Sequence, residues 1–331
     1  MVAAGAFHVH PTMTDSPPEG EAMNTAAMPQ PHCVWDIRAE LGEGPVWSVR
    51  EQALYFVDIV GQAIHRFHPE SGGHASWATP QRPGFVVPAS DGTLICGLKD
   101  GLYGFDPASG RFTCLVAVER DLPGNRINDG CVDSTGRLWF GTMDDGEATP
   151  SGALYSVTRG RGGRLDVLRH DEGYVVTNGP AISPDGTKLY HNNSPAGIIY
   201  VFDLAPDGSL SGRRIFARVA EGYPDGVVVD SAGTVWVGAW NGGRVMRFTP
   251  DGVELPPVAV PAVNVTKVAF GGPDLRTLYV TTARRNTPPD ALARYPQAGG
   301  LFSLRVEVPG QASRAFPADG MDGLCDEVKQ G

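Results

Sequence analysis

The sequence predicts an all-β protein in which one structural unit occurs six times around a closed ring. The clearest copy spans residues 125–143 and reads NRINDGCVDSTGRLWFGTM, a polar cluster and a glycine followed by two short apolar runs that flank a turn. Five related segments keep this plan at intervals of roughly 40 to 50 residues, a repeat length typical of propeller blades, solenoid units and arrays. Six sheets of four strands in cyclic order form a six-bladed β-propeller, whose closure removes long exposed strand edges.

The order of elements within a unit is plainest in the first repeat. Four strand candidates, rich in aromatic and branched residues, follow one another at residues 44–49, 53–59, 63–69 and 74–79. Turns in later repeats are explicit, because proline stands second and glycine fourth in the tetrapeptides at 183–186, 205–208 and 249–252. One strand, at about residues 33–39, is left over before the first repeat. We expect it to complete the last blade beside strands near the C-terminus.

Length and composition are consistent with one closed domain. The chain has 331 residues, with 43 glycines and 28 prolines that favour turns over long helices. We expect the propeller to occupy residues 31–310. Residues 1–30, rich in Pro, Ala, Met and Thr without periodicity, are predicted to form a disordered leader, and residues 311–331 a C-terminal tail.

Charge and cysteine usage limit the partners and the compartment. The net charge is −10 and no block of Lys or Arg is present, which argues against nucleic acid and anionic membranes as partners. Five scattered cysteines, without a CxxC pair, fit a reducing compartment better than a disulfide framework. With no apolar run long enough for a membrane span or a signal peptide, we expect a cytoplasmic monomer or weak homodimer.

Aligning the six copies predicts a ring of side chains around the propeller axis, since the first strand of each blade lines the central channel. At the aligned position the ring contains Glu43, Phe85, Asp129, Asn178, Asp225 and Lys267. Carboxylates that converge on one axis repel one another and lose hydration unless a cation or a hydrogen-bond network holds them. Oxygen donors without His or Cys favour Ca²⁺, Mg²⁺ or Mn²⁺, with Fe²⁺ or Zn²⁺ as alternatives. The competing interpretation is that these residues only cap turns at the blade ends.

Several long motifs carry a family resemblance. They are LGEGPVW at 41–47, NRINDG at 125–130, DSTGRLWFGTM at 133–143, TNGPAISPDG at 177–186 and YPDGVVVD at 223–230. In this order and spacing the chain resembles the SMP-30/gluconolactonase/regucalcin family from about residue 34 to residue 308, and within it the bacterial sugar lactonases. Segments 265–284 and 292–302 are similar to those of bacterial xylonolactonases.

The resemblance implies a six-bladed propeller that hydrolyses aldonolactones with one divalent cation in its channel. It places the metal ligands on Glu43, Asn178 and Asp225, and the substrate contacts on Arg126 and Asn128. Asp129, Phe85 and Lys267 remain further candidates for the site.

Two positions depart from the family pattern. Gly146 stands where animal members have an acid, with Glu147 next to it, which leaves a sugar contact from that loop open. Asn193 stands where many members have Asp, and we assign it no role.

The chemistry is consistent with these residue types. A Lewis-acidic ion can polarise an ester carbonyl and acidify a bound water, and Asp225 is our candidate general base. No GxSxG or HExxH motif supports another hydrolytic mechanism. We expect D-xylono- or L-arabinonolactone as substrate, with D-gluconolactone next. The alternatives are a non-catalytic propeller that binds a metal or a partner, and a hydrolase of another ester, such as a phosphotriester or an acyl-homoserine lactone.

Overall fold

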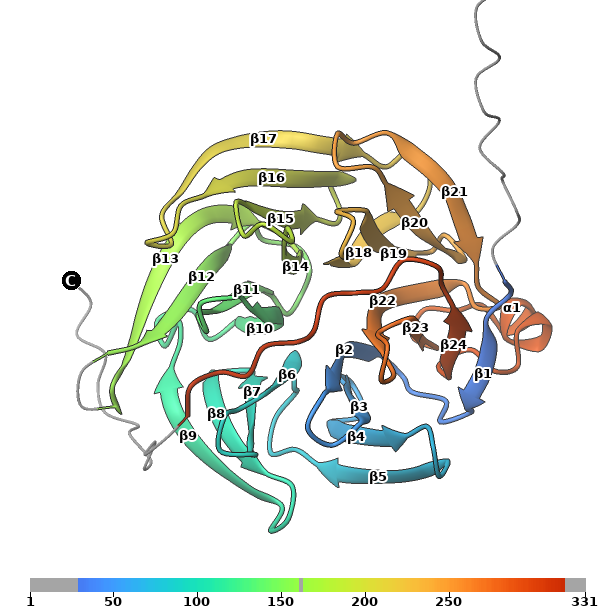
Figure 1. The fold of residues 1–331 in the computed structure, drawn as a ribbon, viewed down its shortest axis with the longest axis horizontal. Coiled ribbons are helices and arrows are strands. Elements are labelled where there is room, and N and C mark those ends of the chain that lie inside the picture. The colour runs from blue at the N-terminus through green and yellow to red at the C-terminus, as the bar shows by residue number, and fades with distance from the viewer. Residues whose placement is uncertain (1–28, 161–162, 319–331) are drawn as a thin grey trace, which may run out of the picture.

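The computed structural model describes residues 29–160 and 163–318 and contains six four-stranded antiparallel sheets arranged around a central axis (Figure 1). The first three blades consist of β2 (Gly42–Ser48), β3 (Ala53–Asp58), β4 (Ala63–His68), β5 (Gly73–Ala78); β6 (Phe85–Pro88), β7 (Leu94–Leu98), β8 (Gly101–Asp106), β9 (Arg111–Ala117); β10 (Asn125–Val132), β11 (Leu138–Asp144), β12 (Gly152–Arg159), β13 (Leu165–Tyr174). The next two consist of β14 (Thr177–Ile182), β15 (Lys188–Asn193), β16 (Ile198–Leu204), β17 (Leu210–Arg218); β18 (Tyr223–Val229), β19 (Val235–Trp240), β20 (Arg244–Phe248), β21 (Glu254–Ala259). The predicted all-β, six-bladed propeller is confirmed.

The last blade joins the two ends of the described chain. It contains β22 (Asn264–Gly271), β23 (Thr277–Ala283), β24 (Leu301–Arg305) and, at its outer edge, β1 (His32–Trp35). β1 runs antiparallel to β24, with Cys33 opposite Phe302. The leftover N-terminal strand therefore closes the ring, as the sequence predicted. A short helix, α1 (Pro289–Arg294), lies in the connection between β23 and β24.

The innermost strands of the six blades are β2, β6, β10, β14, β18 and β22, each the first strand of its blade after the ring is closed. In five of them the pairing with the next strand is interrupted by an irregularity of register, at 43–46, 127–129, 178–181, 224–227 and 265–268. A bulge bends the strand and re-aims a side chain. Each of the five breaks includes a residue of the predicted ring.

The blades pack against each other through apolar side chains, and Trp47, Trp139 and Trp236 are among the largest fully buried ones. The aspartate of the repeat fixes two of these indoles. Asp133 accepts a hydrogen bond of 2.9 Å from Nε1 of Trp139, and Asp230 accepts one of the same length from Trp236. The same carboxylates also accept hydrogen bonds from backbone N–H groups of the following turns. The repeated Asp is thus a structural element of the turn and of the core.

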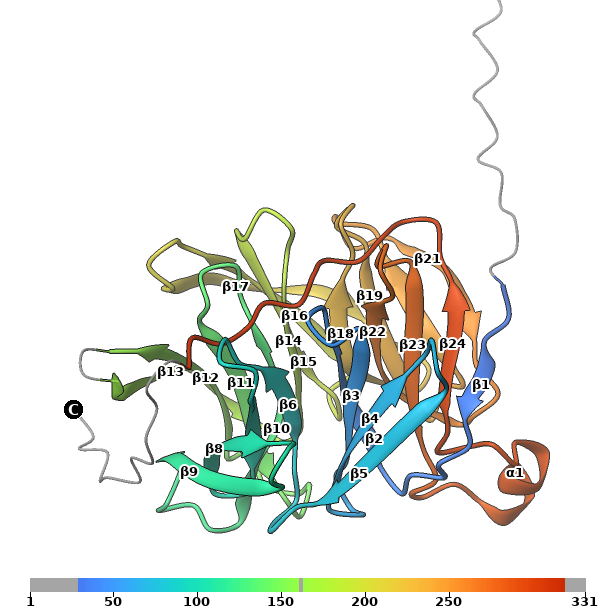
Figure 2. The ribbon, with the colours of Figure 1, turned by 60° about the horizontal axis from the view of Figure 1, so that its bottom comes forward.

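Residues 306–318, which we call the C-terminal strap, cross one end of the channel (Figure 1) and lie over the sheets in the side view (Figure 2). Nε2 of Gln311 donates hydrogen bonds of 3.0 Å to the carbonyls of Ile182 and Val229, which belong to different blades. Phe316 forms a parallel bridge with Ala89 and packs, almost fully buried, into the core between two further blades. The strap therefore ties several blades together.

The domain boundaries at residues 31 and 310 stay predictions. The propeller and strap fill the described residues from 29 to 318, so the first eight residues of the expected tail, 311–318, pack on the propeller. Residues 1–28 of the expected leader and 319–331 of the expected tail lie outside the described residues. In the described part of the chain, no helix is long and apolar enough to cross a membrane.

Candidate functional site

A cavity of about 350 Å³ occupies the end of the channel opposite the strap, which we call the open end. It lies where the inner strands begin, since Glu43, Arg126, Asn178 and Asp225 are all near the N-terminal ends of β2, β10, β14 and β18. All five predicted metal and substrate residues line this one cavity. The rest of its wall is formed by Leu41, Ile59, Met143, Glu147, Val176, Ser194, Pro195, Tyr223, Trp240 and Arg285.

Glycines after the ring residues allow this convergence. A side chain at Gly226, next to Asp225, would overlap the aliphatic part of Lys267. At Gly130 a Cβ atom would lie 2.8 Å from the ring of Phe85. The repeated pattern of a polar residue followed by glycine therefore reflects close packing between neighbouring inner strands.

Glu43 and Asp225 place two carboxyl groups in the wall of the cavity, and both residues are buried. Burial, followed by the charge of Asp129, raises the pKa of Glu43 to about 8. Burial and then the charge of Glu43 raise the pKa of Asp225 well above its ordinary value. Oε2 of Glu43 accepts a hydrogen bond from the backbone N–H of Gly44, whereas no described residue donates one to the buried Oε1. The positive charge of Lys267 lowers the pKa of both carboxyl groups, and that of Arg126 lowers the pKa of Glu43, but burial outweighs these effects.

A hydrogen-bonded chain of side chains orients Asn178. Nη1 of Arg126 donates to Oδ1 of Asn128 at 2.6 Å, and Nδ2 of Asn128 donates to Oδ1 of Asn178 at 3.1 Å. Nδ2 of Asn178 in turn donates to Oγ of Ser194 at 2.9 Å, and Ser194 donates to the carbonyl of Pro224 at 2.6 Å. These hydrogen bonds fix the orientation of the Asn178 amide. Its nitrogen donates to Ser194, and its Oδ1, which accepts from Asn128, has a second lone pair for another partner. Asn128 therefore supports Asn178 as well as lining the cavity.

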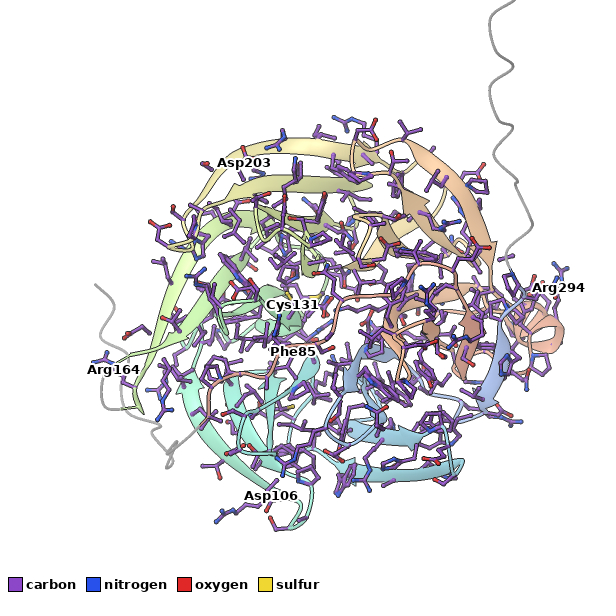
Figure 3. All side chains as sticks on the ribbon, in the orientation of Figure 1. Phe85, Asp106, Cys131, Arg164, Asp203 and Arg294 are labelled. Atoms are coloured by element: carbon purple, nitrogen blue, oxygen red, sulfur yellow. The ribbon has the colours of Figure 1, made fainter. Side chains whose placement is uncertain are left out.

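The three further candidates lie outside this cavity. Lys267 Nζ is 2.5 Å from Oδ1 of Asp129, both side chains are buried, and Oδ2 of Asp129 accepts a hydrogen bond from the backbone N–H of Gly179. The pair lies close enough to Glu43 for both charges to influence its pKa. Phe85 belongs to the apolar core and lies near the centre of the ring in Figure 3. The aligned position thus supplies cavity residues in three blades and packing or an internal ion pair in the other three.

The residues present fit a divalent cation. Two carboxylates and one amide oxygen are donors that hard cations prefer, and the buried Oε1 of Glu43 is an acceptor awaiting a partner. No three His, Cys, Asp or Glu side chains gather at one point within residues 29–160 and 163–318. That result agrees with a donor set in which an asparagine, Asn178, replaces the third acid.

Sequence reasoning missed part of the site. The sequence did not indicate Asp145, whose carboxylate pairs with Arg126. It also did not indicate the cavity residues Arg285, Ser194, Tyr223 and Trp240. Tyr223 lies in the YPDG motif and Glu147 beside the departure at Gly146, so local signals existed for both. Arg285 lies in an irregular segment after β23, where no repeat or motif marks it. Of the two departures, Gly146 and Asn193, neither lines the cavity, while Glu147 does.

The fold and the cavity define the class: a closed six-bladed propeller with a small-molecule-sized site at one end of its axis. A family model described as "SMP-30/Gluconolactonase/LRE-like region" matches residues 41–284, and the chain belongs to this family.

Individual relatives agree with that membership. The chain is 39% identical to a 6-deoxy-6-sulfogluconolactonase of Pseudomonas putida, over 86% of this chain and 97% of that protein. It is 38% identical to an L-arabinolactonase of Azospirillum brasilense, over 85% of this chain and 93% of that protein. Among solved structures, the regucalcin of Agrobacterium tumefaciens, described as a calcium-binding protein, superposes with a TM-score of 0.82 at 31% identity, over 87% of this chain and 97% of that one.

Proposed function

We propose that this protein is a metal-dependent lactonase that hydrolyses sugar lactones to the corresponding aldonic acids. The observation that carries the proposal is the pair of buried carboxylates, Glu43 and Asp225, which line the cavity beside the oriented amide of Asn178, with Oε1 of Glu43 accepting no hydrogen bond from any described residue. Relatives named as lactonases, at 38–39% identity over most of their length, support the reaction class.

Glu43, Asn178 and Asp225 would hold one divalent ion. Such an ion supplies Lewis acidity, which polarises a carbonyl and lowers the pKa of bound water. Oxygen donors favour Ca²⁺, Mg²⁺ or Mn²⁺ over Zn²⁺ or Fe²⁺, and the calcium-binding description of the regucalcin supports Ca²⁺ as the first to test.

Asp225 is the candidate catalytic base. Its carboxylate lies in the cavity wall, where it can accept a proton from the water that attacks the lactone carbonyl carbon. The acyl C–O bond of the ring then breaks, and the ring oxygen leaves as the hydroxyl of the open acid after it receives a proton. Arg126 and Asn128 hold the substrate in place, and their mutual hydrogen bond keeps both side chains in one orientation.

The polar part of the wall favours a small polyhydroxylated substrate, since sugar hydroxyls can pair with fixed donors and acceptors. Pentonolactones such as D-xylono- and L-arabinonolactone are our first candidates, and D-gluconolactone follows. The two classes differ by one hydroxymethyl group, which a pocket distinguishes by only about 1–3 kcal/mol, so we expect overlapping activity.

A second candidate is hydrolysis of a less polar ester. It is favoured by the apolar part of the same wall, which contains Leu41, Ile59, Met143, Val176, Pro195, Tyr223 and Trp240. The aromatic residues are also compatible with stacking on a sugar ring, which keeps sugar lactones first.

A lactone panel assayed with metal analysis tests the proposal. Purified protein is analysed for bound metal, stripped with a chelator and returned to each divalent ion in turn. Acid release from pentono-, hexono- and acyl-homoserine lactones is followed at near-neutral pH against the spontaneous rate. We expect metal-dependent acceleration with the sugar lactones. Bound metal without acceleration of any ester would favour a non-catalytic binding propeller instead.

A further inference from the structure

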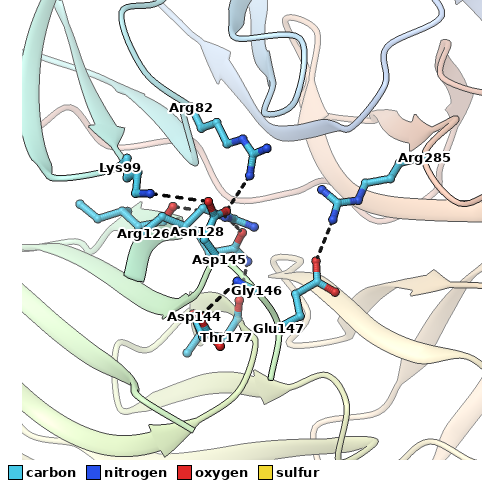
Figure 4. Close-up of polar contacts among 11 residues, drawn as sticks. Arg82, Lys99, Arg126, Asn128, Asp144, Asp145, Gly146, Glu147, Thr177 and Arg285 are labelled. Carbon is cyan, nitrogen blue, oxygen red and sulfur yellow. Dashed lines mark hydrogen bonds and ion pairs between the residues drawn. The ribbon is translucent and has the colours of Figure 1, made fainter. Parts of the chain in front are cut away.

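An unusual concentration of positive charge lies beside the cavity. Three cationic side chains converge on the single carboxylate of Asp145 (Figure 4). Nη1 of Arg82 and Nε of Arg126 lie 2.7 Å and 3.0 Å from its Oδ1, and Nζ of Lys99 lies 3.7 Å from its Oδ2. One carboxylate can balance only one of these charges.

A fourth cation faces the same cavity from the last blade. Nη2 of Arg285 lies 3.3 Å from Oε1 of Glu147, across the opening between segments 138 residues apart, and both side chains line the cavity. The backbone of Arg285 is fixed, because its N–H donates to the carbonyl of Glu40 at 2.9 Å and its carbonyl accepts from Asn264 at 2.7 Å. The ion pair itself is partly exposed, with relative side-chain exposures of 29% for Arg285 and 48% for Glu147. A long, partly solvated pair of this kind contributes little stability and exchanges partners readily.

The cluster as a whole is electropositive. Four cations, Arg82, Lys99, Arg126 and Arg285, face two carboxylates, Asp145 and Glu147. The nearby Asp144 accepts hydrogen bonds from the backbone N–H groups of residues 146, 148 and 149, which favour its charged form, so that four cations stand against three carboxylates in all. The other carboxylates of the cavity, Glu43 and Asp225, belong to the candidate metal site. A surplus of positive charge at this mouth contrasts with the net charge of −10 of the whole chain.

We infer that the substrate is an aldonolactone with an anionic group at the end remote from the lactone carbonyl, and that Arg285 is the residue that binds this group. The inference rests on the proposed function and narrows its substrate class. A neutral lactone leaves the surplus charge unused, whereas a sulfonate, phosphate or carboxylate can accept paired hydrogen bonds from a guanidinium. Arg82 and Lys99 add a long-range attraction that draws an anion toward the mouth.

The test compares neutral and anionic forms of one lactone in the metal-loaded protein. The probes are D-glucono-1,5-lactone, its 6-phospho derivative and its 6-deoxy-6-sulfo derivative, which separate phosphate from sulfonate recognition. We expect kcat/KM to be at least about tenfold higher for one of the anionic lactones, and this preference to decrease as salt is added.

Two variants and a matched control assign the effect to Arg285. Arg285→Gln should reduce the anionic-to-neutral ratio of kcat/KM at least about tenfold, whatever its effect on the neutral lactone. Glu147→Gln, which removes the competing carboxylate, should raise the ratio. Arg284→Gln removes the same charge one residue away, from a guanidinium that donates to the carbonyl of Ala298 and does not line the cavity, and should leave the ratio unchanged.

Each outcome decides something. If the neutral lactone is hydrolysed and the anionic-to-neutral ratio of kcat/KM is at or below one, the inference is wrong and the proposed function stands. If the anionic-to-neutral ratio of kcat/KM is above one in the wild type and does not fall in Arg285→Gln, Arg285 does not bind the anionic group. If Arg285→Gln does not fold, the direction of the Glu147→Gln effect decides that role. Failure to hydrolyse any of the three lactones counts against the proposed function, and this inference then falls with it.

Discussion

The two ends of the central channel are built from the same six inner strands but differ in character. At the open end, where these strands begin, the wall contains Glu43, Arg126 and Asp225, and charged groups face a cavity. At the other end, the strap crosses the axis and covers a cavity of about 250 Å³ whose lining residues are mainly valine, alanine and proline, with Asp133, Lys267 and Arg314 also in its wall. There Phe316 is buried in the core and Gln311 ties two blades together.

The difference teaches that one repeated strand can separate function from stability along its length. Four of the six ring residues are followed by glycine, and the strand then continues inward, as in Asp225 followed by Gly226 and three valines. Changes at the open end should therefore alter catalysis and metal binding more than folding. Changes under the strap should do the reverse.

The largest expected effect is that of Asp225→Ala. Loss of the candidate base, together with one metal ligand, should reduce kcat/KM on the best lactone by at least about 10³-fold. The free energy of unfolding of the metal-free protein should not decrease, because a buried carboxylate beside Glu43 is removed. Initial rates and urea denaturation measure the two quantities. Asp225→Asn is the companion variant, since it can keep an oxygen ligand while it loses the base. An Asp225→Ala enzyme with normal turnover would exclude this residue as the base.

Glu43→Ala separates metal binding from the rest of the site. We expect loss of bound metal and of activity, since the variant removes the carboxylate whose Oε1 has no donor among the described residues. Metal analysis after gel filtration measures the bound ion. A thermal melt with added ion is a second measurement, because an ion at about 100 times its Kd stabilises the wild type by about 2.7 kcal/mol, and we expect no such stabilisation in the variant. A Glu43→Ala protein that keeps both metal and turnover would show that the ligand assignment is wrong.

Phe316→Ala tests the strapped end. The side chain is 1% exposed, so its removal should lower the free energy of unfolding by about 3–5 kcal/mol. The kcat/KM of the folded fraction should stay close to that of the wild type, because Phe316 does not line the open-end cavity. Chemical denaturation and activity at low temperature measure both. The matched control is Arg314→Ala at an exposed position of the strap, for which we expect little change in the free energy of unfolding or in kcat/KM. Loss of activity without loss of stability in Phe316→Ala would contradict the separation of the two ends.

Ser194→Ala is expected to have the smallest effect and refines the description of the open end. Ser194 accepts the hydrogen bond that fixes the nitrogen of Asn178, so its loss lets the amide rotate. Residues that support a ligand in this way typically change metal affinity 10- to 100-fold. We expect a weaker metal affinity within that range and recovery of most of the activity at saturating metal, measured by metal titration of the rate. Unchanged affinity would show that Asn178 keeps its orientation without this support.

The sequence by itself determined much of the protein. The repeat interval and the turn residues specified six blades, and the strand left over before Glu43 specified how the ring closes, because local patterns fix strands and turns. Repeat phase also placed Glu43, Asn178 and Asp225 on one ring, since equivalent positions in a closed array are equivalent in space. The family resemblance added Arg126 and Asn128, and all five residues line one cavity.

Only the tertiary structure decided the rest. Repeat phase could not tell that Asp129 and Lys267 pair with each other while Phe85 joins the core, because the partner of a ring residue lies in another blade. The strap and the Arg285–Glu147 pair lie outside the repeat and join segments far apart in sequence. Such contacts depend on how the closed ring brings irregular segments together, and no local preference of the chain encodes them.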